Sequence, residues 1–479
     1  MKVKIQKIIF IILNFLLILP TIVYFTKNGT VLKFDTFYHF FINEEISRIL
    51  SSSIYLGIII GIFTFYIIIL KKKDLFKNIK QVLIFVAITS LILTITLPMT
   101  SSDIFYYMGV GELDGVYHQN PYYVTMRQYY EQNKENINDE ILEKGVNNFW
   151  SWTTVVYGPV AQLIFKICSV ISLKNVTLCL FVYKFVNLIF HLLNTYFIYK
   201  ITRKKKFAIL YGLNPFILIE SIINVHNDII VVFFVLLALY FLLKKKNLTL
   251  CVISLGISAG IKYITLLILP FVILYYYREE KNIGKRFFRC VEFGMLFLVV
   301  LGVEYLLYFR DFQILSAVLV QTDKYSKSIY SAIWYKNKEL AKILKNITML
   351  IFSITYIRLC IKTLIQKDIK FYKIIREYNL ELVIFLLTIT NAQQWYIMWM
   401  FPTIMWQKQK MIKYIIGVSF ITEIANVVYM YFWEHPAYDI VYVIVLFLLS
   451  VIWIKIVNKY SKGKIEGKQL CLTQGREDN

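Results

Sequence analysis

The stretch Met99–Tyr123 places an acidic side chain where a membrane helix is expected to end. The apolar run Gln81–Leu97 stops at Pro98, and Asp103 follows five residues later. An ionisable group so close to hydrocarbon is costly and is a functional candidate for that reason, and a carboxylate at this place could serve as a general base. The alternative is structural, with Asp103 at the start of a short helix that Ser101 or Ser102 caps.

Polar residues of unusual type also follow other apolar runs. The members of this set are Glu112 and Asp114 in the first long loop, His226, Asn227 and Asp228 after Ile223, Lys262 after Ile261, and Gln393, Gln394, Trp395 and Tyr396 after Thr390. On the topology given below, they share one side of the membrane with Asp103. Amides and aromatic rings can bind a sugar, and a lysine can neutralise a phosphate, so the set suits a site that holds a sugar against an anionic lipid head group.

This interpretation gives each residue a role. Asp103 and Asp228 are the catalytic candidates, and Lys262 and His226 are the candidates for binding the donor phosphate. The sugar and acceptor candidates are Tyr107, Asn120, Tyr157, Asn227, Gln393, Gln394, Trp395 and Tyr396.

A purely structural alternative exists for most members of the set. Asn227 and Asp228 could cap the helix that follows them. Lys262 could extend its ammonium to the membrane interface, and the aromatic residues from Trp395 onward could belong to an interfacial belt. Glu112 and Asp114 are expected to be solvated loop charges.

The composition is that of a helical membrane protein with many spans. Of 479 residues, 58% are hydrophobic and only 17% are charged, and the mean hydropathy is +0.60, whereas soluble domains carry about 25% charged residues. The net charge of +23 does not indicate nucleic-acid binding, because Lys and Arg cluster between apolar runs, as the positive-inside rule expects. Most of the six cysteines lie inside apolar runs, without metal-binding or disulfide spacing.

We expect an all-α polytopic protein with about 14 transmembrane helices and both termini in the cytoplasm, because the lysine-rich loops then fall on one side. The expected spans are Ile8–Phe25, Ile54–Leu70, Gln81–Pro98, Val176–Tyr199, Phe207–Ile223, Ile229–Leu243, Leu248–Ile261, Ile264–Tyr277, Val291–Phe309, Ile347–Leu364, Leu380–Thr390, Ile397–Trp406, Tyr414–Phe432 and Ile440–Val457. Val160–Leu173 is short and contains Lys166, so it is expected to lie in the outer interface. The first large loop, with Asp103, then faces outward.

The chain divides into three parts on this scheme. Residues 1–80 form an N-terminal helix hairpin, residues 81–457 the transmembrane catalytic core, and residues 458–479 a polar cytoplasmic tail. The first apolar run is too long for a signal-peptide core and is expected to be retained. An outer turn is expected at Trp433–Pro436.

Five segments in order carry a resemblance to a known family. They are SSDIFYYMGVGELDGVYHQNPYYV from Ser101, WTTVVYGPV from Trp152, LNPFILIESIINVHNDIIVVFFVLLALYFLL from Leu213, SAGIKYITLLILPFVIL from Ser258 and NAQQWYIMWMFP from Asn391. Together, over Pro98–Pro402, the chain resembles the bacterial polyprenol-phosphate-mannose-dependent mannosyltransferases of the GT-C superfamily. The resemblance implies a GT-C-like bundle, an outward-facing active site, a lipid-phosphate sugar donor, and a base in the first large outer loop, which is Asp103 here.

The chain departs from the family pattern in its acidic residues. Asp103 has no acidic neighbour in tandem, and a helix hairpin precedes the helix that delivers it. Asp228 is therefore the candidate for the second acid. No cofactor is predicted beyond the donor substrate, and a divalent metal is not excluded.

The predicted reaction transfers a hexose, with mannose favoured, from a polyprenyl-phosphate sugar to an extracytoplasmic glycan or glycolipid by inverting displacement. A transporter or flippase of lipid-linked sugars is one alternative, although it would favour charges at mid-membrane depth and repeated halves. A surface-glycan ligase or polymerase, which would use a diphosphate donor, is another. The sequence identifies neither the sugar nor the acceptor.

Overall fold

A computed structural model describes residues 2–29, 32, 45–72, 75–316, 324–367, 369–431 and 438–462. The predicted turn Trp433–Pro436 and the tail beyond residue 462 lie outside these residues. Helices make up most of the described chain. Its first half contains α1 (Lys2–Leu16), α2 (Leu19–Asn28), α3 (Glu45–Lys71), α4 (Ile79–Thr94), α5 (Asp103–Gly115), α6 (Met126–Asn133), η2 (Lys134–Asn136), α7 (Glu140–Val146), η3 (Phe149–Trp152), α8 (Pro159–Ile171), α9 (Val176–Thr202), α10 (Lys205–Gly212), α11 (Pro215–Leu218), η4 (Ile219–Ile223) and α12 (Asp228–Tyr240).

The second half of the described chain is also helical. It contains η5 (Phe241–Lys245), α13 (Leu248–Ala259), η6 (Tyr263–Ile268), α14 (Leu269–Tyr276), α15 (Ile283–Tyr305), η7 (Phe312–Leu315), α17 (Ile329–Trp334), α18 (Lys338–Ile365), α19 (Phe371–Thr388), η8 (Gln394–Trp406), α20 (Gln409–Tyr431) and α21 (Tyr438–Lys462). The π-helical segments η4 and η5 continue α11 and α12, and η6 and η8 are 3-10 helices.

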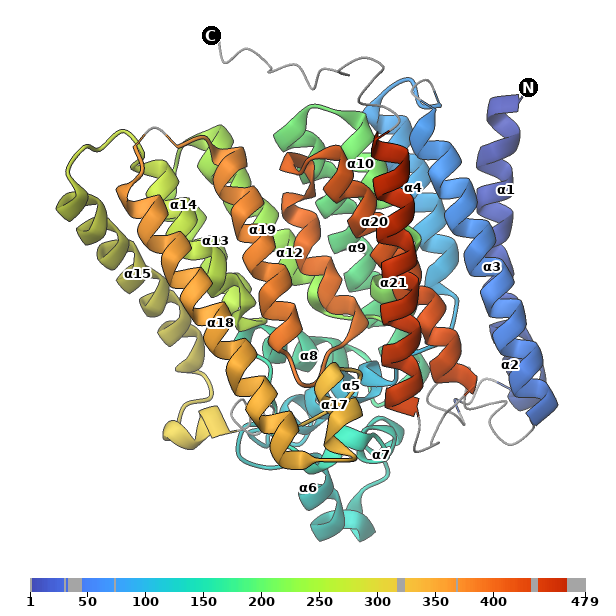
Figure 1. The fold of residues 1–479 in the computed structure, drawn as a ribbon. Helices are drawn as coiled ribbons and strands as arrows, with labels where there is room; N and C mark the ends of the chain where they lie inside the picture. The colour runs from blue at the N-terminus through green and yellow to red at the C-terminus, as the bar shows by residue number, and fades with distance from the viewer. Residues whose placement is uncertain are drawn as a thin grey trace.

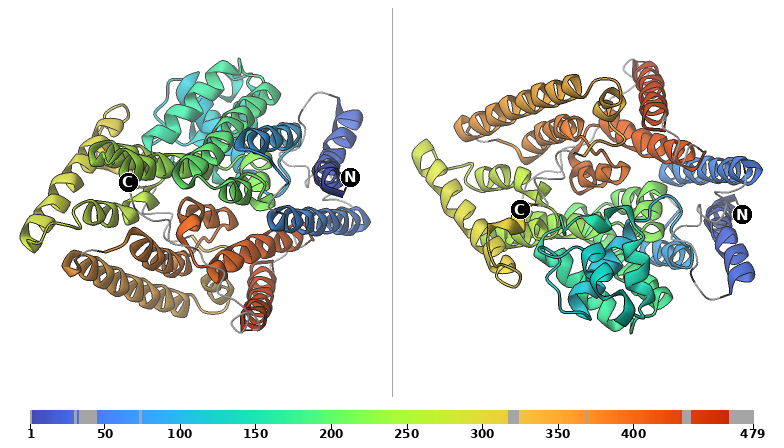
Figure 2. Two further views of the ribbon diagram at one scale, coloured as in Figure 1. Left: turned by 90° about the horizontal axis from the view of Figure 1, so that it is seen from above. Right: turned by 90° about the horizontal axis from the view of Figure 1, so that it is seen from below.

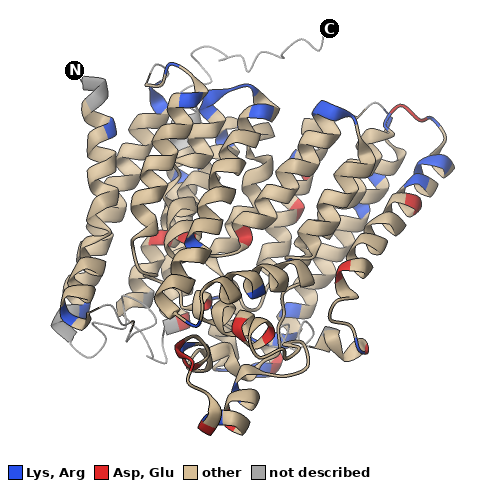
Figure 3. Ribbon diagram, turned by 180° about the vertical axis from the view of Figure 1, so that it is seen from behind, with Lys and Arg blue, Asp and Glu red and all other residues tan. Residues whose placement is uncertain are grey.

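The long helices run side by side, and the short helices gather at one end (Figure 1). The segment α1 begins at the upper end of the bundle and α21 ends there, whereas α5, α6, α7 and α17 lie at the lower end. Viewed along the bundle, α18–α21 lie on the opposite side from α9, α12 and α13, and α1–α4 close one edge (Figure 2). Lys and Arg colour the upper rim, while the lower end carries charges of both signs (Figure 3).

Several described helices are membrane spans by length and composition. Six are long and apolar enough to cross a bilayer, or seven if α10 and the bent segment after it count as one span, so this is a multi-pass membrane protein. Every range expected as a span overlaps a helix, but several of these helices are short, and the number 14 stays a prediction. Several helices begin well before the predicted ranges, as α18 does at Lys338 rather than Ile347 and α19 at Phe371 rather than Leu380. The range Ile397–Trp406 lies in the 3-10 helix η8.

The N-terminal helices are bonded to the rest of the bundle. The Tyr66 hydroxyl donates to the Leu210 carbonyl at 2.7 Å, and the Leu97 N–H donates to Thr21 Oγ1 at 2.8 Å. The Tyr55 hydroxyl donates to the buried carboxylate of Glu423 in α20 at 3.0 Å. The first 80 residues are thus fastened to both α10 and α20, and their separation as a domain stays a division by sequence.

Candidate active site

A cavity of about 520 Å³ contains both Asp103 and Lys262. Tyr157, from the first half of the chain, and Trp395, from η8, line the same cavity. Both are candidates for sugar binding. The complete set of predicted site residues in its wall is Asp103, Tyr157, Lys262, Gln393, Trp395 and Tyr396. The structure therefore brings together segments that are nearly 300 positions apart in the chain.

Asp103 begins α5, and its side chain keeps 17% of its surface exposed. Ser102 occupies the N-cap position but makes no side-chain cap bond; instead, the Asp103 N–H donates to Ser101 Oγ at 3.3 Å. Burial raises the pKa of Asp103 above its ordinary value of 3.8, and the nearby side chains of His226, Lys327 and Lys262 oppose this rise. A partly exposed carboxylate with a raised pKa is suited to accept a proton.

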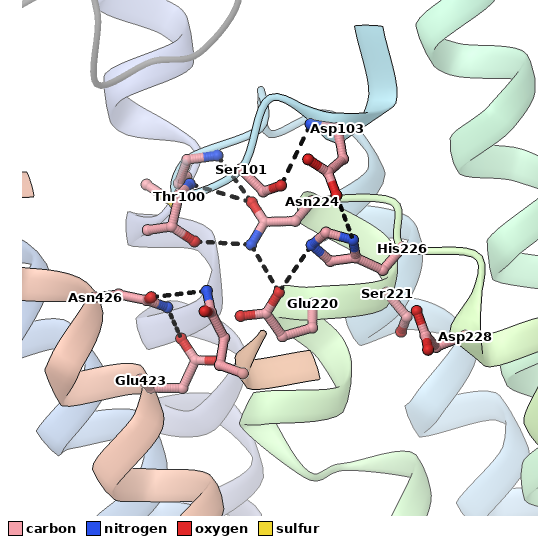
Figure 4. Close-up of polar contacts among 12 residues, drawn as sticks. Thr100, Ser101, Asp103, Glu220, Ser221, Asn224, His226, Asp228, Glu423 and Asn426 are labelled. Carbon is pink, nitrogen blue, oxygen red and sulfur yellow. Dashed lines mark hydrogen bonds and ion pairs between the residues drawn. The ribbon is translucent and has the colours of Figure 1, made fainter. Parts of the chain in front are cut away.

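His226 lies behind Asp103 rather than in the cavity. Its Nδ1 is 4.0 Å from Asp103 Oδ2, and its Nε2 is 3.2 Å from Glu220 Oε2 (Figure 4). The ring is fully buried and stacks on Trp395, with 3.5 Å between centroids. His226 is thus held between two carboxylates and under an aromatic wall residue, which is not the position predicted for a phosphate-binding group in the cavity.

Asn224 ties this turn to the segment that carries Asp103. Its amide nitrogen donates to Glu220 Oε2 at 3.2 Å and to Thr100 Oγ1 at 2.8 Å. Its carbonyl oxygen accepts the N–H groups of Met99 and Thr100 at 3.1 and 3.2 Å. All four bonds are buried, so the distance between the Asp103 segment and the His226 turn is closely fixed (Figure 4).

The local sequence explains why the turn forms here. Asn214 accepts from the Phe216 N–H, and Pro215 occupies the first helical position, so the helix restarts at a bend of 51°. The restarted helix ends as π-helix at Ile223, a form that often marks functional sites. Val225 then adopts a φ of 62°, which costs a β-branched residue about 1–3 kcal/mol.

Lys262 is paired with a buried acid. Its Nζ lies 2.6 Å from Asp228 Oδ2, and the Trp399 indole N–H donates to Asp228 Oδ1 at 2.6 Å. Asp228 is fully buried, while the Lys262 side chain keeps 13% exposure. The Lys262 ammonium also lies 5.5 Å from the ring centroids of both Tyr157 and Tyr396. These contacts hold the lysine at the cavity wall and do not extend it toward the membrane interface.

Two glycines let the Tyr157 and Lys262 segments meet. The Val160 N–H donates to the Gly260 carbonyl at 2.8 Å, and the Gly158 N–H donates to the Ile261 carbonyl at 3.3 Å. A Cβ on Gly158 would lie 2.5 Å from the Gly260 carbonyl oxygen. Only glycine permits this backbone contact, which places Tyr157 beside Lys262.

The segment before the predicted span Ile397–Trp406 divides between the cavity and the core. Trp395 is buried at 5% exposure yet lines the cavity, and Tyr396 stacks on Trp399 with 4.4 Å between centroids. Gln393 lines the cavity as well, but Gln394 is buried and donates to Asn426 at 2.9 Å. Trp395 and Tyr396 therefore form part of the cavity wall.

Besides Gln394, three predicted sugar contacts lie away from the cavity. Tyr107 is buried against Phe165 and accepts from the Tyr157 hydroxyl at 3.3 Å. Asn120 donates to the Tyr308 carbonyl at 2.7 Å and lines a separate cavity of about 380 Å³. Asn227 is the N-cap residue of α12 without a side-chain cap bond, and its buried amide has no partner.

The expectation that Glu112 and Asp114 are solvated was wrong. Both are buried, with 0% and 5% exposure, because α5 is covered by α7 and α8. Burial and the neighbouring Asp139 carboxylate raise the pKa of Glu112. Asp114 is neutralised by Lys166 Nζ at 2.9 Å and accepts the Tyr308 hydroxyl at 2.8 Å.

Four residues near the site were missed from the sequence. Glu220 and Asn224 stand behind the catalytic candidates, and Trp150 and Lys345 line the cavity. Glu220 lies inside the run expected as a span, and an ionisable residue there was an available signal. Within the described part of the chain, three or more His, Cys, Asp or Glu residues do not come together as a metal site.

One comparison with known proteins identifies a family. A family model described as "Alpha-(1->6)-mannopyranosyltransferase, N-terminal domain" matches residues 21–278, which is more than half of the chain and includes Asp103, His226, Asp228 and Lys262. Neither a curated protein nor a solved structure matches the chain. The protein is a glycosyltransferase that belongs to the alpha-(1->6)-mannopyranosyltransferase (MptA_B) family.

Proposed function

We propose that this mannosyltransferase takes mannose from a polyprenyl-phosphate donor and transfers it to a hydroxyl of an extracytoplasmic glycan or glycolipid. The observation that carries the proposal is the cavity in which the partly exposed Asp103 carboxylate and the Lys262 cation share a wall with aromatic side chains. An acid that accepts a proton and a cation that faces a phosphate are the two charges this transfer requires.

The apolar part of the cavity supports a lipid-linked donor. Leu266 and Met349, from η6 and α18, line the cavity and keep 46% and 38% exposure. Met349 lies in a part of α18 that also exposes Leu350, Ile351 and Ile354, so the polyprenyl chain could leave the cavity sideways into the bilayer. Lys262 and Lys345 line the same cavity, and their ammonium groups would bind its phosphate.

In the proposed reaction, the acceptor hydroxyl oxygen attacks the anomeric carbon and Asp103 takes its proton. The bond between the anomeric carbon and the phosphate oxygen breaks, and the electron pair leaves on the phosphate. Lys262 stabilises the charge that builds there, and the single displacement inverts the anomeric centre. Asp228, which is enclosed behind Lys262, acts in this scheme by holding the lysine rather than as a second acid.

The charge distribution supports an outward-facing site. Lys and Arg gather at the end of the bundle where α1 begins, and the α5 end lies opposite (Figure 3). By the positive-inside rule, the lysine-rich rim and both termini would lie on the cytoplasmic side of the cell membrane. Asp103 faces the exterior on this orientation.

Transfer is tested with the purified protein in nanodiscs, radiolabelled polyprenyl-phosphate mannose and octyl α-mannoside as acceptor. Asp103→Asn is expected to lower kcat by about 10²–10⁴-fold, because a positioned base is lost. Asp114→Asn, the same change on the same helix outside the cavity, is the control and should keep its rate. Normal turnover by Asp103→Asn, or movement of the donor across the bilayer without a new glycosidic bond, contradicts the proposal, and so does a requirement for a diphosphate donor.

A further inference from the structure

The 3-10 turn η3 presents two large aromatic side chains to water. In a 3-10 helix, residues three apart lie on one face, and Phe149 and Trp152 have this spacing. They keep 79% and 64% of their surface exposed, while Ser151 between them is fully buried. Exposed aromatic surface of this kind often marks a binding site.

This turn is fastened to the catalytic segment. The Asn148 amide donates to the carbonyl of Ser102, the residue before Asp103, at 2.9 Å. The Asn148 side-chain oxygen also accepts the Trp150 N–H and so caps η3. Trp150 and Thr153 line the cavity, so each exposed aromatic residue is the chain neighbour of a residue in the cavity wall.

The surroundings of the pair are aqueous. The turn η3 contacts α6 and α7, which project beyond the ends of the long helices (Figure 1). The connecting sequence is strongly charged, with Arg127, Glu131, Lys134, Glu135, Glu140, Glu143 and Lys144. Hydrocarbon would not admit so many charges, which argues against a membrane anchor.

Trp152 packs on an arginine side chain. The Arg127 guanidinium lies 4.8 Å from the Trp152 ring centroid. Arg127 itself donates to the Val146 carbonyl at 3.1 Å and lies 3.7 Å from Glu131. This contact favours one position of the ring, and the arginine beside it can donate to hydroxyls.

We propose that Phe149 and Trp152 form an acceptor platform, which binds sugar residues of the acceptor glycan beyond the residue that receives mannose. The apolar C–H faces of sugar rings would pack on the two aromatic rings, and hydroxyls would bond to Arg127. This inference rests on the proposed function and specifies an extended, water-exposed glycan as the acceptor.

The test compares two acceptors, octyl α-mannoside and octyl α-(1→6)-mannotetraoside, with the same labelled donor. Trp152→Ala and Phe149→Ala are each expected to raise the KM for the tetrasaccharide about tenfold, a typical loss for an important contact residue. The KM for the monosaccharide should not change, since it does not reach the platform. Phe312→Ala, which removes another highly exposed aromatic (82%) in η7, should change neither.

Each other outcome overturns the inference. If the KM rises equally for both acceptors, the aromatic pair supports the fold or the cavity and does not bind the longer acceptor. If the KM changes for neither acceptor, the pair does not bind glycan. If the KM rises in nanodiscs and not in detergent, the pair contacts lipid. Trp152→Phe should keep part of the tetrasaccharide preference. If the wild type uses neither acceptor, the proposed function fails together with the platform, whereas failure of the platform alone leaves wild-type transfer intact.

Discussion

Mutation of the pair of Asp228 and Lys262 can decide whether Asp228 positions the lysine or acts as an independent catalytic acid. Asp228→Asn keeps the size of the side chain but removes the charge that faces Lys262 Nζ at 2.6 Å. An asparagine can accept from either the lysine or the Trp399 indole, but its NH₂ group then opposes the other donor. The change therefore removes an ion pair and at least one buried hydrogen bond.

The expected loss of folding free energy follows from the burial of this ion pair. Breaking a buried ion pair by removing one partner costs about 3–5 kcal/mol, and the 13% exposure of Lys262 places this pair near the lower end. If Asp228 acts by positioning Lys262, the displaced cation should lower kcat by about 10²-fold, comparable with the loss of one transition-state donor. Lys262→Met should produce a loss of the same order.

Initial rates of mannose transfer for the two single variants and the double variant decide between the roles. A positioning role predicts that Asp228→Asn/Lys262→Met is no slower than Lys262→Met alone, because both changes remove one function. Asp114→Asn is the matched control, since it removes the partner of Lys166 at 2.9 Å outside the cavity. It should lower thermal stability and leave kcat unchanged. A double variant whose loss equals the product of the two single losses refutes the positioning role and restores Asp228 as an independent acid.

Three further changes have defined outcomes. Because burial raises the pKa of Asp103 and the proposed base is its carboxylate form, kcat/KM should fall as the pH drops through a value above 3.8. Lys327→Met removes a cation that favours the carboxylate, so the acidic limb of the pH profile should move to higher pH than in the wild type. A shift to lower pH contradicts the assignment of Asp103 as the base. Gly158→Ala forces a Cβ to 2.5 Å from a backbone oxygen and should cost about 1–3 kcal/mol in thermal unfolding with a higher donor KM, whereas Gly302→Ala, with nothing within 4 Å, should be neutral or stabilising. Tyr55→Phe deletes the hydroxyl that bonds a buried glutamate in α20 and should lower stability by about 1–3 kcal/mol without changing KM.

Hydropathy predicted where helices lie but not how each one is formed. The long run Val176–Tyr199 corresponds closely to α9, because a long uninterrupted apolar segment has few alternatives in a bilayer. The range Ile397–Trp406 forms a 3-10 helix that contains Pro402, and hydropathy does not distinguish helix types. Glu112 and Asp114 were misjudged for a related reason, since the helices that bury them, α7 and α8, lie further along the chain.

Some predicted site residues that line the cavity come a few positions after an apolar run. Asp103, Lys262 and Gln393 all have this position. Chain order places such residues at one end of the bundle but does not determine depth or direction. This explains why His226 turned out to lie behind the wall and Asn120 beside another cavity.

Two direct contacts between distant parts of the chain explain how a bundle of short and bent helices can hold the candidate site residues at fixed distances. Buried Asn224 binds the backbone of Met99 and Thr100, and the backbone contact between Gly158 and Gly260 fixes Lys262. Both connections act on loops, so the positions of Asp103 and Lys262 do not depend on the exact lengths of the helices. The φ of 62° at Val225 fits this arrangement, because a strained β-branched residue persists only where its surroundings over-determine the backbone. The geometry of the active site is therefore set by its loops, and the helices around it supply burial and contact with lipid.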